Sequence, residues 1–221
     1  QSGSAYICYN NLGVWEEHTK LLPSDGEASD VFGYAVSISV DYAIVGAYYD
    51  DDNGFSSGSA YIFNLHDGIW QQQAKLVPSD NKSGDQFGKS VSISGNYAII
   101  GAPYDNHNGS QSGSAYIFYN NNGTWQEHSK LLPNDGAIDD KFGFSVGITN
   151  NFAIVGAYDD AVGGKDTGSA YIFFKNQNVW HQGTKLLASD GDEGDSFGYS
   201  VSISGNSAVV GAPFDDAQEF S

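Results

Sequence analysis

The 221-residue sequence contains no methionine, no arginine and only one cysteine. It also lacks an apolar run as long as a membrane-spanning helix needs, so no membrane insertion is predicted. The single cysteine excludes an internal disulfide framework. Because methionine and a recognisable signal peptide are both missing, the chain is expected to be a mature product or a segment of a longer protein.

Positive charge is scarce as well. Nine lysines stand against 27 acidic residues, which gives a formal net charge of −18. A chain with this balance repels nucleic acid and anionic membranes and attracts cations. Nucleic acid is therefore excluded as a partner, and cations become candidate ligands.

What the sequence does contain is a repeat. Tryptophans, Gly-Ala pairs and Gly-Ser-Ala-Tyr-Ile segments all recur every 55 residues, without insertion or deletion. Phe-Gly pairs recur with the same step, at Phe32-Gly33, Phe87-Gly88, Phe142-Gly143 and Phe197-Gly198. A fixed period of this size is typical of repeat architectures. Residues 1–221 are therefore predicted to form a single domain of four equivalent units.

Each unit carries four strand signals. In the copy that starts at Phe32, residues 36–39 alternate apolar and polar, and 43–47 are apolar on both faces. Residues 59–63 are intermediate and 70–76 are mostly polar. This gradient is typical of a β-propeller blade read from its axis outward. The predicted fold class is all-β, a propeller of four blades with four antiparallel strands each.

Turn residues support the division into strands. Two residues join the first strand to the second. Three copies of this turn suit a tight hairpin with positive φ, namely Gly95-Asn96, Asn150-Asn151 and Gly205-Asn206. Residues that tolerate a left-handed backbone mark the turn before the fourth strand, at Gly13, Gly68, Gly123 and Asn178.

The chain begins in the middle of a unit. Complete blades are predicted at 32–77, 87–132 and 142–187. Residues 1–22 supply a third and a fourth strand, and residues 197–221 supply a first and a second. We expect the two ends to share one blade and so close a four-bladed ring. The alternative is a window cut from a longer array.

These residues resemble a known family. Phe-Gly, then an amphipathic strand, then Gly-Ala-Pro, as in Gly101-Ala102-Pro103 and Gly211-Ala212-Pro213, is similar to the FG-GAP repeat. The resemblance spans essentially the whole chain. It implies the β-propeller of integrin α chains and of many secreted or surface proteins of microbes. Integrin propellers have seven blades and an Asp-x-Asp-x-Asp-Gly calcium loop between their first two strands, where this chain has only a two-residue turn.

Aspartate recurs three times in every unit, in loops that an up-down-up-down blade places at one end. Twelve carboxylates are therefore expected on one face: Asp25, Asp30, Asp50, Asp80, Asp85, Asp105, Asp135, Asp140, Asp160, Asp190, Asp195 and Asp215. Clustered carboxylates suit Ca²⁺, which takes about six to eight oxygen ligands. The alternative is a loop network in which aspartates cap turns and pair with the recurring Lys20, Lys75, Lys130 and Lys185.

Three further features each leave two readings. Trp15, Trp70, Trp125 and Trp180 open the outermost strands, where packing between blades is expected and stacking on a sugar is the alternative. Cys8 occupies a position that is phenylalanine in the other units, so a buried inert thiol is expected, with an intermolecular disulfide as the alternative. Sequons at Asn81, Asn108 and Asn122 fall in predicted loops and suit N-glycosylation of a secreted protein, although such sequons also arise by chance.

The sequence offers no catalytic constellation. Of five histidines, only His18 and His128 share a repeat position, and neither neighbours a plausible serine or cysteine nucleophile. The chain is therefore expected not to be an enzyme, with a hydrolase as the remaining enzymatic alternative. The sequons and the resemblance to FG-GAP proteins predict an extracellular location. Two function classes remain. One is an adhesion or lectin-like module that binds a protein or glycan. The other is a building block whose identical subunits join in a surface or fibrous assembly, and calcium is a candidate stabiliser of either.

Overall fold

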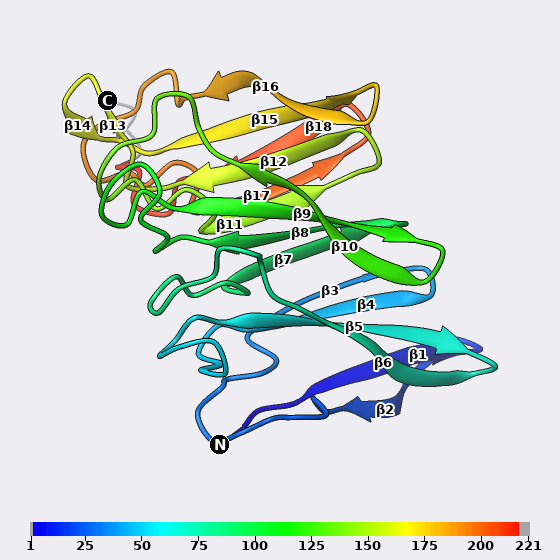
Figure 1. Ribbon diagram of the computed structural model, residues 1–221. Coiled ribbons are helices and arrows are strands. Elements are labelled where there is room, and N and C mark those ends of the chain that lie inside the picture. Colours follow the sequence, from blue (N-terminus) through cyan, green and yellow to red (C-terminus); the bar gives the residue numbers. More distant parts are fainter. Residues whose placement is uncertain (1, 217–221) are drawn as a thin grey trace.

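The computed structural model describes residues 2–216, and all regular secondary structure in that range is β (Figure 1). Three antiparallel sheets have four strands each. They are β3 (Ala35–Ser39), β4 (Tyr42–Ala47), β5 (Ser59–His66) and β6 (Ile69–Leu76); β7 (Ser90–Ser94), β8 (Tyr97–Ala102), β9 (Ser114–Asn121) and β10 (Thr124–Leu131); and β11 (Ser145–Ile148), β12 (Phe152–Ala157), β15 (Ser169–Asn176) and β16 (Val179–Leu186). Within residues 2–216 there is no helix of the length and apolarity that would span a membrane.

Shorter sheets complete the chain. β1 (Ala5–Asn11) pairs with β2 (Val14–Leu21), and β17 (Ser200–Ser204) pairs with β18 (Ser207–Gly211). The ribbon of β13 (Ala161–Val162) and β14 (Lys165–Asp166) lies within a loop. The predicted four-strand unit is therefore confirmed in three copies, with strand boundaries close to those expected.

The hydrophobic core lies between successive sheets. Ile44 and Ile62 of the first sheet share one buried cluster with Phe87 and Ile100 of the second unit. Strands β4 and β8 are buried along almost their whole length because neighbouring sheets cover both of their faces. Each four-stranded sheet thus depends on its neighbours for its core, as a stacked repeat does.

The recurring glycines permit main chain to touch main chain between units. A Cβ on Gly46 would overlap the carbonyl oxygen of Gly88 in the next unit. Gly88 itself has a φ of +92°, a left-handed conformation that side chains disfavour. Parallel bridges add to this joint, among them Gly58 to Phe87. The Phe-Gly and Gly-Ala pairs are therefore the two halves of one backbone contact.

The hairpins between the first two strands differ from expectation in two of the units. Val40 takes a φ of +53°, although a β-branched residue is the least suited to it, because the Ser39–Tyr42 pair closes the turn in the same register as the other hairpins. Asn150 does not take a positive φ. In that unit the Thr149 N–H donates to the Phe152 carbonyl at 2.7 Å, and the Thr149 hydroxyl adds a second bond to it.

The closed four-bladed ring is not observed in the described residues. β1–β2 and β17–β18 are separate two-stranded half-sheets at opposite ends of the stack (Figure 1). Their missing neighbours leave apolar side chains uncovered, and Cys8 is exposed. The expectation of a buried thiol was therefore wrong, because the inner strands that cover its equivalents are absent from this half-sheet.

Candidate functional site: the loop end of the stack

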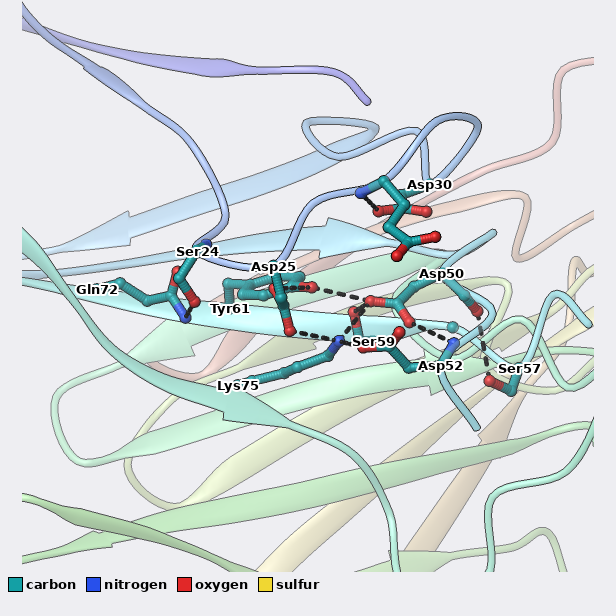
Figure 2. Close-up of polar contacts among 12 residues, drawn as sticks. Ser24, Asp25, Asp30, Asp50, Asp52, Ser57, Ser59, Tyr61, Gln72 and Lys75 are labelled. Carbon is teal, nitrogen blue, oxygen red and sulfur yellow. Dashed lines mark hydrogen bonds and ion pairs between the residues drawn. The ribbon is translucent and has the colours of Figure 1, made fainter. Parts of the chain in front are cut away.

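Three units build the same ion-pair network along one side of the stack, where each unit carries its long loops. We call this side the loop end; it carries the loops at 22–34 and 48–58 and their equivalents. In the first unit, Nζ of Lys75 lies 2.9 Å from Oδ2 of Asp25 and 2.8 Å from Oδ2 of Asp50. The Tyr61 hydroxyl donates to Asp25 at 3.0 Å and to Asp50 at 2.8 Å. Figure 2 shows these side chains converging from two loops and from β5 and β6.

The second and third units repeat this arrangement. Nζ of Lys130 lies 2.6 Å from Oδ2 of both Asp80 and Asp105. Nζ of Lys185 lies 2.7 Å from its two carboxylates, Asp135 and Asp160. Pairing with the recurring lysine, one of the two roles considered for these aspartates, is therefore what the structure shows in three units.

Electrostatics hold these groups in their charged forms. Burial alone would raise the pKa of Asp50, but hydrogen bonds from Lys75 and Ser59 outweigh it and bring the pKa below its ordinary value. Burial would likewise lower the pKa of Lys130, yet its aspartate partners raise it. Burial raises the pKa of Tyr61, so its hydroxyl remains a donor at neutral pH. Each complete network therefore combines at least two carboxylates with one ammonium group, and in the first unit Asp52 is a third partner of Lys75 at 2.5 Å.

The third aspartate of each unit has a different environment. Asp30, Asp85, Asp140 and Asp195 are almost fully buried, and each accepts a backbone N–H within its own loop. Oδ2 of Asp85 accepts from the Lys82 N–H at 2.8 Å, whereas its Oδ1 has no partner within residues 2–216. Burial, supplemented by the charge of Asp105, raises the pKa of Asp85 to about 6. Burial also raises the pKa of Asp140 to about 6.

The lysine networks bear on the calcium expectation. In each of the three units an ammonium group lies between the two carboxylates, in the position that a shared cation would take. The described residues 2–216 contain no group of three or more histidine, cysteine, aspartate or glutamate side chains placed to hold one metal ion. These donor sets, as arranged, therefore do not fit calcium.

The fourth network is incomplete. Its aspartates, Asp190 and Asp215, belong to the last unit, whereas its lysine, Lys20, stands on β2 at the other end of the stack. Within residues 2–216, Lys20 makes no ion pair and lies 5.5 Å from the centre of the Tyr6 ring. Desolvation and the nearby carboxylates of Asp195 and Asp190 raise the pKa of Asp215. The chain thus carries the two halves of a network without joining them.

An aromatic surface also lies at the loop end, and the sequence analysis missed it. We define it by eight residues: Tyr34, Tyr48, Tyr49, Tyr104, Phe144, Tyr158, Tyr199 and Phe214. In its first half, the rings of Tyr34 and Tyr48 are 4.5 Å apart, and those of Tyr48 and Tyr49 are 4.1 Å apart. Nζ of Lys89 lies 4.4 Å and 4.0 Å from the centres of the Tyr34 and Tyr48 rings, within range of a cation–π interaction.

The second half of the aromatic surface comes from later units. Phe144 packs edge-on against Tyr158 at 4.4 Å and contacts Tyr199 at 5.0 Å. Tyr104 belongs to the second unit. Burial raises the pKa of both Tyr48 and Tyr158, and the phenol of Tyr104 adds a smaller effect in the same direction. One signal was available in the sequence. All eight residues directly follow a Phe-Gly or Gly-Ala pair or stand one place later.

A cavity adjoins the aromatic surface. Its volume is about 410 Å³, and Tyr49, Asp51, Phe55, Ser29 and Gln86 line part of it. Phe55 is 80% exposed, and Tyr49 is shared with the aromatic surface. The loop end therefore combines a hollow, exposed rings and carboxylates, which are the elements of a small-ligand or partner site.

The tryptophans and the sequon asparagines singled out in the sequence differ in their exposure to solvent. Trp125 is buried, contacts Tyr42 of the previous unit, and donates to the Gln73 side chain at 2.9 Å. Packing between units is thus confirmed for this tryptophan, whereas Trp15 is exposed. Asn108 and Asn122 are exposed, while Asn81 donates to the Gly58 carbonyl at 3.3 Å.

Comparison with known proteins agrees with this repeat. The sequence model of the FG-GAP repeat matches residues 15–63, 70–118, 125–173 and 180–220. The matches cover most of the chain and keep the 55-residue step. A search of curated proteins found no match.

Proposed function

Because this chain belongs to the FG-GAP repeat family, we propose that it is a non-enzymatic, extracellular binding module whose ligand surface is the loop end. The ligand class proposed is a protein or a glycan on another cell or in its surroundings. One observation carries the proposal: the exposed rings of the aromatic surface gather beside a cavity, on loops that buried ion pairs hold in place.

The chemistry of this surface favours recognition. Tyrosine supplies large, rigid contact area together with a hydroxyl group, which is why it dominates many binding surfaces. Tyr34 is 51% exposed and Tyr199 is 40% exposed, so both rings are available to a ligand. Lys89 adds a positive charge in an otherwise acidic chain. Stacking, hydrogen bonding and charge can therefore act together on one ligand.

Glycan binding is the more specific alternative within this proposal. A glycan array probed with the labelled protein tests it, and binding to cells before and after glycosidase treatment separates a glycan from a protein ligand. Tyr34→Ala and Tyr49→Ala should each weaken binding at least tenfold. Tyr9→Ala, which removes an exposed tyrosine from β1, is the matched control and should bind normally. Equal binding by all three variants would place the ligand elsewhere.

Two further predictions belong to this proposal, one about calcium and one about secretion. Since lysines occupy the carboxylate pairs, we expect the melting temperature to change by less than about 1 °C between EDTA and millimolar calcium. A rise of several degrees in calcium would instead support an ion in the loops. Secretion is supported by the exposed Asn108 and Asn122 sequons, whose occupancy can be read by mass spectrometry after expression through a secretory pathway.

A second candidate function is the building block of a larger assembly. One observation favours it: neighbouring units share a buried core and a backbone contact, such as that of Gly46 with the Gly88 carbonyl, and the same joint recurs from unit to unit.

A further inference from the structure

We propose that the cavity beside Tyr49 binds the side chain of a lysine presented by a protein partner. This inference rests on the proposed binding function and deepens it, because it names the chemistry that one part of the loop end recognises. Three observations support it: the rings and the carboxylate that line the cavity, the negative charge around it, and an ammonium group that the aromatic surface already holds.

The cavity lies where the long loops of the first and second units meet. Tyr49 and Phe55 supply aromatic rings to its lining, Asp51 supplies a carboxylate and Gln86 supplies an amide. Its volume of about 410 Å³ is within the range of ligand-binding pockets. The faces of aromatic rings attract cations, and a carboxylate forms charge-assisted hydrogen bonds with an ammonium group. This lining therefore has the chemistry that recognises an organic ammonium ion.

The groups that would bind the lysine are open to solvent. Phe55 is 80% exposed and Tyr49 is 40% exposed. The aliphatic stem of a lysine can cover such rings while its charged end stays near a carboxylate. Asp51 is exposed as well, and within residues 2–216 it makes no ion pair, whereas its neighbours Asp50 and Asp52 both pair with Lys75. The carboxylate of Asp51 is thus available to a ligand.

The surroundings of the cavity are strongly negative. In the first unit three carboxylates share the single ammonium group of Lys75, and Asp51 adds a fourth carboxylate nearby. Burial raises the pKa of Asp30, and the charges of Asp50, Asp51 and Asp52 add to that effect. A cation that enters the cavity is attracted by this field, whereas an acidic or phosphorylated ligand is repelled. A neutral sugar would gain nothing from it.

The aromatic surface already holds one ammonium group. Nζ of Lys89 lies 4.4 Å from the centre of the Tyr34 ring and 4.0 Å from that of the Tyr48 ring. The Tyr48 ring lies 4.1 Å from the ring of Tyr49, which lines the cavity. A lysine of the chain thus occupies two of these rings. A lysine of the partner would make the same type of contact with Tyr49 and Phe55.

Main-chain hydrogen bonds hold the walls of the cavity together. The Gly84 N–H donates to the Phe55 carbonyl at 2.9 Å, and the Gln86 N–H donates to the Ser56 carbonyl at 3.1 Å. The loop of the first unit is therefore fixed to the loop of the second before any ligand arrives. Because the site is formed in advance, the entropy cost of ordering it on binding is small.

The repeat does not require the side chains that would bind the lysine. In the second unit, Asn106 stands at the position of Asp51, and Ser110 stands at the position of Phe55. That unit still forms the turn, because the Gly109 N–H donates to the Asn106 carbonyl as the equivalent pair does in the first unit. Aspartate and phenylalanine at these two positions are therefore particular to this cavity, and the second unit's residues can replace them without unfolding the loop.

Nα-acetyl-lysine methylamide is the probe that tests the proposal. Amide shifts of nitrogen-15-labelled protein should change saturably at residues 49–56 and 84–86, with a Kd in the millimolar range that one side chain can supply. The norleucine analogue, which keeps the stem and lacks the charge, should bind at least about tenfold more weakly. No saturable change with the lysine probe would overturn the proposal. Methyl glucoside that binds as tightly would overturn it in favour of a sugar, and choline that binds more tightly would overturn the assignment to a lysine side chain.

Variants that borrow the second unit's residues locate the site. Asp51→Asn and Phe55→Ser should each weaken binding of the lysine probe at least about fivefold, with unchanged circular dichroism spectra. Asp41→Asn, which removes an exposed carboxylate from a hairpin turn, is the control for charge. Ile69→Ser, which removes an exposed apolar side chain at the hairpin end of β6, is the control for Phe55. Both controls should bind as the wild type does. An equal loss in Asp51→Asn and Asp41→Asn would show attraction to net charge alone and would contradict the cavity site.

The cavity proposal and the binding function can fail separately. Binding of a glycan or of cells that depends on Tyr34, without saturable binding of the lysine probe, would overturn the cavity proposal and leave the binding function standing. Saturable lysine binding that Asp51→Asn weakens would support the cavity even if no glycan or cell binds.

Discussion

Oδ2 of Asp105 lies 2.6 Å from Nζ of Lys130, and the carboxylate is almost completely buried. Removing one partner of such a pair leaves the other charged in a poorly solvated place. Lys130→Met should therefore lower the free energy of unfolding by about 2–3 kcal/mol, somewhat less than for a fully buried pair because Asp80 is partly exposed.

Lys20→Met is the internal control for this variant, since it removes the lysine at the same repeat position, where Lys20 makes no ion pair within residues 2–216. In dilute, monomeric solution its effect should stay below about 0.5 kcal/mol. Urea denaturation of both variants provides the comparison. Equal losses would show that the lysine acts through its aliphatic stem and not through the ion pair.

The buried Asp85 and Asp140 should give stability an unusual pH dependence. Their pKa values near 6 lie above the ordinary 3.8, so their contribution is fully present below about pH 4 and is lost as the pH rises through 6. Asn at either position keeps an oxygen acceptor for the loop N–H and cannot ionise. Each substitution should leave stability unchanged at pH 4 and raise it by about 1–2 kcal/mol at pH 7.5.

The lysine-paired Asp50 should change stability with pH in the opposite direction. Its pKa is lowered, so its contribution is present at neutral pH and disappears as the pH falls below the ordinary value. Thermal melts from pH 3 to 8 would separate the two classes. Asp41→Asn, which changes an exposed aspartate, serves as the control. If the melting temperature of Asp85→Asn depended on pH in the same way as that of the wild type, the assigned burial effect would be contradicted.

Gly101→Ala should destabilise the stack by at least about 2 kcal/mol. The added Cβ would overlap the Gly143 carbonyl and also approach the Ser90 hydroxyl. Gly211→Ala meets only the equivalent hydroxyl, that of Ser200, and should cost less than about 1 kcal/mol in a monomeric sample. The difference in denaturation midpoint isolates the backbone contact, and similar midpoints would refute it.

Tryptophan fluorescence should report the open end of the stack. Trp15 is 71% exposed, whereas Trp125 and Trp180 are buried. Acrylamide should therefore quench the wild type more than Trp15→Phe. Trp125→Phe should remove the protected emission and, through the lost bond to Gln73, about 1 kcal/mol of stability. Equal quenching of both variants would contradict these exposures.

Much of the fold could be predicted because every unit repeats the same local pattern. The strand and turn positions follow from alternation and from turn residues, and the structure placed β3 to β6 within a few residues of them. The pairing of Lys75 with Asp25 and Asp50 was accessible for the same reason, since all three positions recur.

The predictions that were wrong or missing concern residues whose environment depends on neighbours distant in the sequence, which a local pattern does not reveal. Cys8 occupies a core position, yet it is exposed because the strands that would cover it are missing. Val40 adopts a positive φ because the hairpin register outweighs its own preference. The aromatic surface was missed because its residues are aromatic in only some units, and they meet across units.

The contact of Gly46 with the Gly88 carbonyl has an evolutionary consequence. A joint formed by main-chain atoms does not depend on the identity of the side chains around it. Duplication, deletion or exchange of a whole unit leaves every remaining joint with the same two partners. The number of units can therefore change during evolution, and the surface residues of each unit can vary without altering its contact with the next unit.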